Sequence, residues 1–213
     1  MSESQTQKIN HYYNDPMFEQ PYFTYPNLYA NIVREFPNNS HFVEVGSWKG
    51  QSSSFMAVEI HNSNKNIKFD CVDTWTGSIT EDCHQNDEFV KNGTLYDKFL
   101  SNIKRVSHII TPVVGDSVQV AEKYEDNSLD FVFIDADHRY ENVKADIEAW
   151  INKVKNNGII AGHDYGWCQD VRDAVHDTLG QGEGEFTDRY GKAYKSYQDP
   201  WGEGCWLIRV SRS

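Results

Sequence analysis

Residues 129–165 read LDFVFIDADHRYENVKADIEAWINKVKNNGIIAGHDY, and this stretch decides the fold. Its two ends, 129–134 and 158–161, are short apolar runs that are typical of buried strands. Between them, apolar residues recur at steps of three and four, which predicts a helix over 141–154 with one buried stripe; they are Val143, Ile147, Trp150, Ile151 and Val154. The tripeptide at 156–158, Asn-Asn-Gly, is expected to end that helix. The stretch therefore predicts a strand, a helix and a second strand.

The same alternation continues over most of the chain. Other strand-like runs lie at 41–45, 68–73 and 109–114. Other helical stretches lie at 52–61, 95–106 and 117–123. Strands joined by helices of this length imply right-handed crossovers and a mostly parallel sheet covered on both faces. We therefore predict an α/β fold that is doubly wound, with ligands at the carboxyl ends of its strands.

The chain is expected to form a single domain over residues 1–213. It has no internal repeat and no linker-like tract, and 213 residues suit one α/β domain. Residues 1–40, with an amphipathic helix at 22–36, are predicted to form an N-terminal helical cap on a core at 41–213. Two polar segments, 76–93 and 180–201, do not fit the alternation, and such insertions are commonly lids or binding loops. Surface excursions without a function are the alternative for both.

Composition excludes several classes of protein. The formal charge of −12 opposes the phosphate backbone, so we expect no nucleic-acid partner. No stretch approaches the roughly 20 apolar residues of a membrane span, and the first residues lack the apolar run of a signal peptide. The four cysteines have neither zinc-site spacing nor the density of a disulfide scaffold. These observations favour a cytoplasmic protein with reduced thiols and no membrane partner.

The turn after the first strand carries two glycines. Residues 44–50 read EVGSWKG, with Gly46 and Gly50 ahead of a predicted helix. Glycine permits a tight turn and a close backbone approach, and the free N–H groups of a helix start suit an anion such as a ligand carboxylate. The spacing differs from the three-glycine dinucleotide fingerprint and from the Walker loop. This turn, with Ser47 and Trp48, is a candidate cofactor loop, and a purely structural turn is the alternative.

Acidic residues close the second and third strands. Asp73, followed by Thr74 and Trp75, stands where the acid of dinucleotide folds binds the ribose hydroxyls. Asp116 and Ser117 follow the third strand, where they suit either the cap of the next helix or an adenine edge. For Asp73, an exposed turn aspartate without a ligand is the alternative.

The fourth and fifth strands each lead to an acid and a histidine. Asp135 and His138 follow the fourth strand, and His163 and Asp164 follow the fifth. Because the carboxyl ends of parallel strands meet at one edge of a sheet, these side chains are expected at one mouth. Carboxylates with an imidazole suit a hard divalent cation and a general base. Separate surface charges are the alternative.

The whole pattern resembles a known family. Five blocks follow one another within residues 41–165: FVEVGSWKG, FDCVDTW, VVGDS, LDFVFIDADHRYENVKADIEAW and NGIIAGHDY. Together they resemble the class I methyltransferases that depend on S-adenosylmethionine. The last two blocks resemble the metal-dependent O-methyltransferases of small molecules, the macrolide-sugar type in particular. The resemblance implies a Rossmann-like sheet of seven strands.

The resemblance also implies roles for single residues. Asp135 and Asp164 would bind the metal, Mg²⁺ in that family, and His138 would be the catalytic base. The cofactor would contact Glu44, Gly46, Ser47, Trp48, Gly50, Asp73, Thr74, Trp75, Asp116, Ser117 and Asp135. Where those enzymes carry a second acid before the last ligand, this chain has His163, and imidazole binds Mn²⁺, Fe²⁺ or Zn²⁺ better than Mg²⁺. His163 therefore joins the predicted metal ligands.

The predicted activity is methyl transfer from S-adenosylmethionine to a hydroxyl of a small molecule, a sugar or another vicinal diol, assisted by Mg²⁺ or Mn²⁺. Two alternatives stay open: a methyltransferase that needs no metal, and a non-catalytic module that binds S-adenosylmethionine. A nicotinamide oxidoreductase is disfavoured, because the third glycine after Gly46 is missing. Related enzymes often assemble into homo-oligomers, but the sequence leaves the assembly and the acceptor undetermined.

Overall fold

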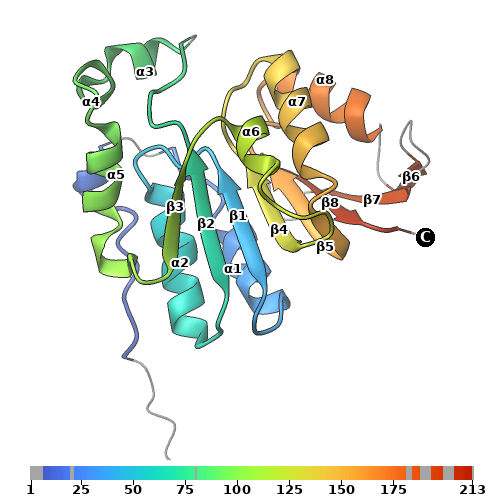
Figure 1. The fold of residues 1–213 in the computed structure, drawn as a ribbon, viewed down its shortest axis with the longest axis horizontal. Helices are drawn as coiled ribbons and strands as arrows, with labels where there is room; N and C mark the ends of the chain where they lie inside the picture. Colours follow the sequence, from blue (N-terminus) through green and yellow to red (C-terminus); the bar gives the residue numbers. More distant parts are fainter. Residues whose placement is uncertain are drawn as a thin grey trace, which may run out of the picture. The chain divides into compact units, whose positions relative to one another are not determined.

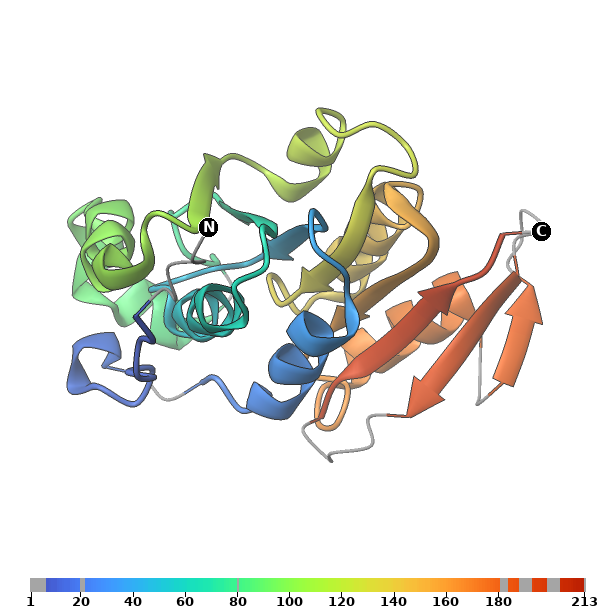
Figure 2. The ribbon, with the colours of Figure 1, turned by 90° about the horizontal axis from the view of Figure 1, so that it is seen from below.

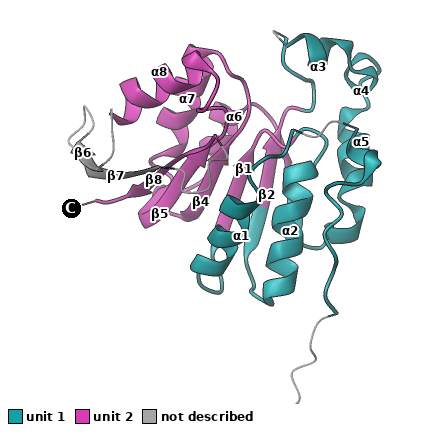
Figure 3. Cartoon of the chain, turned by 180° about the vertical axis from the view of Figure 1, so that it is seen from behind, with its two compact units in different colours: residues 1–40, 48–69, 75–111 teal, residues 41–47, 70–74, 112–213 magenta. Residues whose placement is uncertain are grey.

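A computed structural model describes residues 7–19, 22–79, 81–180, 184–187, 193–198 and 204–212; for 184–187 and 193–198 it describes the backbone alone. The chain forms two compact units (Figure 3). Unit 1 comprises residues 1–40, 48–69 and 75–111, and unit 2 comprises residues 41–47, 70–74 and 112–213.

In the part of the chain that the structure describes, the sheet has eight strands in the order β3-β2-β1-β4-β5-β8-β7-β6 (Figure 1). They are β1 His41–Val45, β2 Lys68–Asp73, β3 Ile110–Val114, β4 Leu129–Ile134, β5 Val154–Gly162, β6 Gly184–Thr187, β7 Ala193–Gln198 and β8 Trp206–Val210. Strand β4 is parallel to β1 and to β5, whereas β8, β7 and β6 extend the sheet in antiparallel fashion (Figure 2). The predicted doubly wound, Rossmann-like α/β sheet is confirmed, with eight strands in place of the expected seven.

Unit 2 buries one apolar face of this sheet under three helices. They are α6 Ser117–Ala121, α7 Tyr140–Trp150 and α8 Gln169–Leu179. The predicted stripe of α7 is buried, and Val143, Ile147 and Trp150 lie in one cluster with Val43 and Val132 of the strands. Each fully buried apolar side chain contributes about 1.5–3 kcal/mol to folding. The apolar side chains of the strands and those of the helical stripe therefore pack together in one core.

The end of α7 differs from the prediction. The helix stops at Trp150, and β5 already begins at Val154, which pairs with Leu129. The register between β4 and β5 shifts before Phe131, and Asn157 adopts a positive φ of 65°. Between the pairs Leu129–Val154 and Phe131–Ile159, β4 advances by two residues and β5 by five, so β5 accommodates three extra residues. The Asn-Asn-Gly tripeptide therefore marks a bulge-like irregularity inside a strand. Asn and Gly suit this bulge for the same reason that they suit a helix end.

Unit 1 is built around helices and aromatic side chains. Its helices include α1 Pro26–Glu35, α2 Gln51–Ser63, α3 Asp82–Asn86, α4 Glu88–Lys91 and α5 Leu95–Asn102, besides the short 3-10 turns at Pro16–Phe18 and Lys104–Val106. The helix predicted at 22–36 starts at Pro26, because proline suits the first position of a helix. Helix α1 packs on α2, and the rings of Phe23, Tyr25 and Tyr29 contact one another beside them.

The two predicted lid segments have different structures. Segment 76–93 holds α3 and α4, which meet at Asp87. In segment 180–201, the described residues include the β6–β7 hairpin, so an irregular loop is the wrong description for that part; residues 181–183, 188–192 and 199–201 lie outside the described residues. Within the described ranges, no helix combines the length and apolar character needed to cross a membrane.

Candidate functional site at the strand ends

The residues that follow the parallel strands of unit 2 lie in one row. Backbone hydrogen bonds join each strand end to the next, from Gly115 N to Asp73 O (2.9 Å), Gly46 N to Val72 O (2.9 Å), Asp135 N to Val45 O (2.8 Å) and His163 N to Ile134 O (3.1 Å). Neighbouring strands are about 4.8 Å apart, so the row from β3 to β5 spans roughly 19 Å. The sequence-predicted residues of unit 2 therefore share one edge of the sheet.

Gly46 allows two of these strand ends to approach closely. Its φ is +88°, and a Cβ built on it would lie 1.9 Å from the carbonyl oxygen of Asp135. No side chain fits there, and the predicted need for glycine is confirmed. The approaching group is the backbone after β4, which brings Asp135 beside the first turn.

Two acids that were predicted to contact the cofactor lie at this edge in different environments. The carboxylate of Glu44 is buried, accepts a hydrogen bond from Ser47 Oγ at 2.9 Å and lies 3.7 Å from Cys71 Sγ. Asp73 is half-buried at the end of β2, and Thr74 is exposed. Asp73 and Thr74 are thus accessible to a ligand, whereas Glu44 is part of the framework behind the turn.

Asp116 and Ser117 are engaged in holding α6. Asp116 caps this helix through a hydrogen bond from Gln119 N at 3.2 Å, and Ser117 Oγ accepts one from Trp150 Nε1 at 2.8 Å. Ser117 also hydrogen-bonds the buried Asp146 of α7. Burial raises the pKa of Asp146 to about 7; the bond from Ser117 lowers it and the nearby Asp116 raises it further. The capping role of Asp116 is confirmed, and the adenine contact stays a prediction.

The four residues after β4 and β5 come together as predicted. His138 Nε2 lies 2.7 Å from Asp164 Oδ2, and His163 Nδ1 lies 3.0 Å from Asp164 Oδ1 and 3.8 Å from Asp135 Oδ1. Asp164 is 6% exposed and has a φ of +62°, a conformation that aspartate tolerates better than most residues. The alternative of separate surface charges is therefore wrong.

Asp164 is held as a carboxylate. Burial alone would raise its pKa, but the hydrogen bonds and charges of His138 and His163 lower it far below the usual range. A third donor was not predicted: Trp167 Nε1 donates to Asp164 Oδ1 at 2.6 Å, and the Trp167 ring lies edge-on to His138 with centroids 5.7 Å apart. The only signal in the sequence was an indole three residues after the acid.

The cluster has donors that suit a divalent cation. One ligand atom each from Asp135, His138 and Asp164 lies within 4.8 Å of the others. Two carboxylates and an imidazole fit Mn²⁺, Fe²⁺ or Zn²⁺ better than Mg²⁺. The structure thus groups His138 with the two predicted acids. His163 lies outside this group of three, although its Nδ1 is 3.0 Å from Asp164 Oδ1 and 3.8 Å from Asp135 Oδ1.

A second group in unit 1, formed by Glu81, Cys83 and His84, also brings three ligand atoms within 4.8 Å. The backbone N–H of Ser78 donates to His84 Nδ1 at 3.0 Å. In a neutral imidazole the proton then resides on Nε2, which leaves neither nitrogen with a lone pair for a metal. In this conformation the group fits a metal poorly.

The remaining predicted cofactor residues belong to unit 1. Trp48, Gly50 and Trp75 all have positive φ values, of 46°, 81° and 51°. Trp75 Nε1 donates to the carbonyl oxygen of Trp48 at 2.9 Å, which joins the turn to the second residue after β2. A Cβ on Gly50 would approach Ile103 and Phe99 within 3.0 Å. Close packing therefore fixes this half of the turn.

Comparisons with known proteins indicate the family of the chain. A family model described as a methyltransferase domain matches residues 43–165, which is more than half of the chain. Uncharacterized protein R132 of Acanthamoeba polyphaga mimivirus is 26% identical over 169 residues, covering 78% of this chain and 71% of that protein.

Similar solved structures include three methyltransferases. The O-methyltransferase from Bacillus cereus in complex with SAH has a TM-score of 0.60 at 16% identity, covering 93% of this chain and 91% of that one. The O-methyltransferase NovP has a TM-score of 0.60 at 16% identity, with coverages of 88% and 79%. The calicheamicin methyltransferase CalS11 has a TM-score of 0.58 at 14% identity, with coverages of 86% and 76%.

These likenesses to solved structures concern the fold, whereas the family model matches most of the strand-end row, from β1 to the residue after Asp164. The chain belongs to the methyltransferase-domain family, and its fold is that of the class I enzymes that depend on S-adenosylmethionine.

Proposed function

We propose that the protein transfers a methyl group from S-adenosylmethionine to a hydroxyl of a small molecule, a sugar or another vicinal diol. The observation that carries this proposal is the pair formed by His138 and Asp164 beside Asp135, at the ends of two adjacent strands. O-methyltransferases among the similar structures support the reaction class.

His138 is the proposed general base. Methyl transfer is an in-line displacement, so the acceptor oxygen must approach the methyl carbon opposite the sulfur and lose its proton. Asp164 is ionised, so the proton between Asp164 and His138 belongs to Nε2 and the lone pair of the neutral ring lies on Nδ1. Nδ1 would accept the proton, and Asp164 would stabilise the resulting imidazolium.

The cofactor is proposed to lie along the strand-end row of unit 2. Asp73, half-buried after β2, would accept hydrogen bonds from the ribose hydroxyls. Gly46 holds the backbone close enough to β4 for Asp135 to lie beside the turn. Trp48, Gly50 and Trp75 of unit 1 stay predicted contacts.

A divalent ion, Mg²⁺ or Mn²⁺, would be held by Asp135 and Asp164, with the imidazole of His163. When bound, it would supply positive charge that orients and acidifies a hydroxyl of the diol. One observation favours the metal-independent alternative: both oxygens of Asp164 already accept hydrogen bonds, from His138 on one side and from Trp167 and His163 on the other.

Replacing His138 tests the proposal. His138→Ala should lower turnover by about 10²- to 10⁴-fold, because general-base catalysis contributes on that scale. The affinity for S-adenosylhomocysteine (SAH), the demethylated product of the cofactor, should stay nearly unchanged when it is measured by calorimetry. His108→Ala is the control, since this histidine is exposed in unit 1 and pairs with His61. Turnover that survives in His138→Ala would refute the assigned base.

The metal is tested separately. Methyl transfer by the wild-type protein is measured after chelation and again after Mg²⁺ or Mn²⁺ is restored. Loss and recovery of activity would support the metal-assisted reaction, whereas unchanged activity would establish the metal-independent alternative. His163→Ala distinguishes the two histidines: a ligand role predicts rescue by excess metal, which a base role would not show.

A further inference from the structure

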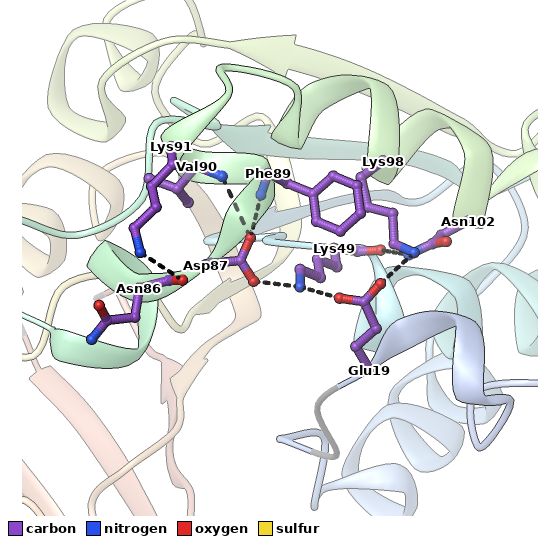
Figure 4. A network of polar contacts seen from close by, with 9 residues as sticks. All are labelled: Glu19, Lys49, Asn86, Asp87, Phe89, Val90, Lys91, Lys98 and Asn102. Carbon is purple, nitrogen blue, oxygen red and sulfur yellow. Dashed lines mark hydrogen bonds and ion pairs between the residues drawn. The ribbon is translucent and has the colours of Figure 1, made fainter.

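Lys49 is a buried cation within the predicted cofactor turn. Its side chain is 1% exposed, and its ammonium lies 2.6 Å from Asp87 Oδ2 and 2.7 Å from Glu19 Oε2 (Figure 4). Burial alone would lower the pKa of Lys49, but the hydrogen bonds to these two carboxylates raise it. A buried charge is tolerated only when it is paired and hydrogen-bonded. The turn can therefore keep Lys49 buried in this conformation only while Asp87 pairs with its ammonium group.

The network joins distant parts of unit 1. Glu19 comes from the N-terminal segment, Lys49 from the turn before α2, and Asp87 from the junction of α3 and α4. Lys98 of α5 pairs with the other oxygen of Glu19 at 2.8 Å, and the Phe89 ring lies about 5 Å from both ammonium groups (Figure 4). All of these partners are separated from Lys49 by 30 residues or more, so the network has no local origin in the sequence.

Asp87 performs two tasks with different oxygens. Oδ1 accepts the backbone N–H groups of Phe89 and Val90 and so caps α4, while Oδ2 accepts from Lys49. The hydrogen bonds from Lys49 and from the backbone lower the pKa of Asp87 more than burial raises it. One carboxylate thus fixes both the start of α4 and the position of the lysine.

The segment formed by residues 81–93 touches the turn at a second point. The ring of His84, in α3, stacks on Trp48 with centroids 3.9 Å apart and an interplanar angle of 18°. Trp48 and Lys49 are adjacent in the chain, so two neighbouring residues of the turn are each held by the same segment.

We propose that Lys49 and Asp87 are positioning residues, whose ion pair holds segment 81–93 against the turn at 48–50 and thereby couples the order of that segment to cofactor binding. The inference rests on the proposed function, because it takes Trp48 and Gly50 as cofactor contacts. Neither Lys49 nor Asp87 needs to touch the cofactor, since both act through the turn.

Asp87→Asn separates the two tasks of this side chain. Asparagine caps helices as well as aspartate does, with its single oxygen. Its amide N–H₂ then faces the ammonium of Lys49, so the ion pair is lost while the cap stays. SAH should bind about 5- to 150-fold more weakly, the range of typical coupling between sites. Amide hydrogen exchange should become faster in 81–93 and remain unchanged in α7.

A matched control removes an ion pair elsewhere. Asp126 pairs with Lys153 at 2.8 Å in unit 2 and is 64% exposed, so Asp126→Asn should change neither SAH affinity nor exchange in 81–93. Glu19→Gln removes the more exposed partner of Lys49 and should weaken SAH binding in the same direction, but less. This second variant keeps the test decisive if Asp87→Asn fails to fold.

The outcomes separate the inference from the proposed function. If the wild-type protein binds no SAH, the proposed function fails. If the wild type binds SAH and the folded Asp87→Asn and Glu19→Gln variants bind it equally well, the positioning role is overturned. A lower melting temperature with unchanged SAH affinity would likewise overturn it, because the network would then be only structural.

Discussion

At the scale of single residues, Asp73 offers the most direct test of the cofactor site. Asp73 is half-buried at the end of β2, next to Val72, whose carbonyl oxygen accepts a hydrogen bond from Gly46 N. Asp73→Ala should weaken SAH binding by about 1.5–3 kcal/mol, the value of hydrogen bonds to a charged group. Calorimetry measures this change, with Asp126→Ala as the control on an exposed acid. Equal affinity in Asp73→Ala and wild type would remove Asp73 from the site.

Asp146 should make stability depend on pH. Its pKa is raised to about 7 in the folded protein from 3.8, so the folded state binds more protons than the unfolded state between these values. The free energy of unfolding therefore falls as the pH rises through this window. Asp146→Asn keeps an acceptor for Ser117 without the charge, and at pH 8 it should be up to about 4 kcal/mol more stable than wild type, at about 1.4 kcal/mol per pKa unit.

Denaturant titrations at pH 5 and pH 8 check this prediction. The advantage of Asp146→Asn should be largest at pH 8 and should shrink toward pH 5, because protonated aspartic acid and asparagine are then nearly equivalent. An advantage that is the same at both pH values would show that the carboxyl titrates far from neutrality.

The functional residues at strand ends could be predicted from the sequence, whereas the residues that contact and position them could not. Asp135, His138, His163 and Asp164 were found because parallel strands bring their carboxyl ends to one edge. The bond from Trp167 to Asp164 and the pair of Lys49 with Asp87 were missed. Such contacts depend on loop conformations and on residues far apart in the chain, which no periodicity encodes.

At the scale of elements, Gly46 tests how closely β1 and β4 must approach at their ends. Gly46→Ala should lower the free energy of unfolding by about 2–6 kcal/mol, since a strained φ and overpacking each cost about 1–3 kcal/mol. Gly93→Ala is the control, because its φ of 67° is similar but its Cβ would meet nothing within 4 Å. It should cost only about 1–2 kcal/mol, the penalty of the left-handed conformation. Equal losses in the two variants would contradict the role given to the Asp135 carbonyl.

Element boundaries were predicted with uneven success. Asp116 was offered as the cap of the helix after the third strand, and it caps α6. The helix predicted at 22–36 starts later, at Pro26, and the short helix capped by Asp87 was not predicted. The tripeptide before Ile159 failed as a helix stop, because a bulge needs the same residues. The chain after residue 180 was also misjudged, since the polar sequences of β6 and β7 lack the apolar runs that revealed the central strands.

At the scale of the whole molecule, the sequence predicted the mostly parallel, doubly wound part of the sheet, but it did not predict the antiparallel extension. Alternation of strands and helices requires crossovers, and the order β3-β2-β1-β4-β5 is one of the few that such crossovers allow. Strands β6, β7 and β8 pair with one another in antiparallel fashion, and β8 pairs with β5 in the register that sets Leu207 opposite Ala161. That pairing depends on long-range contacts, so only the structure reveals it.

The cofactor class is also tested on the whole molecule. A ligand that binds only the folded protein adds about 2.7 kcal/mol of stability at a hundred times its Kd. For a chain of 213 residues this should raise the melting temperature by roughly 5–11 °C, at about 2–4 °C per kcal/mol. SAH should give this shift and NAD should give none, because the turn at 46–50 lacks the third glycine of the dinucleotide loop. A shift with NAD alone would reverse the assignment, since the strand-end row would then hold a dinucleotide and His138 would have no methyl acceptor to deprotonate.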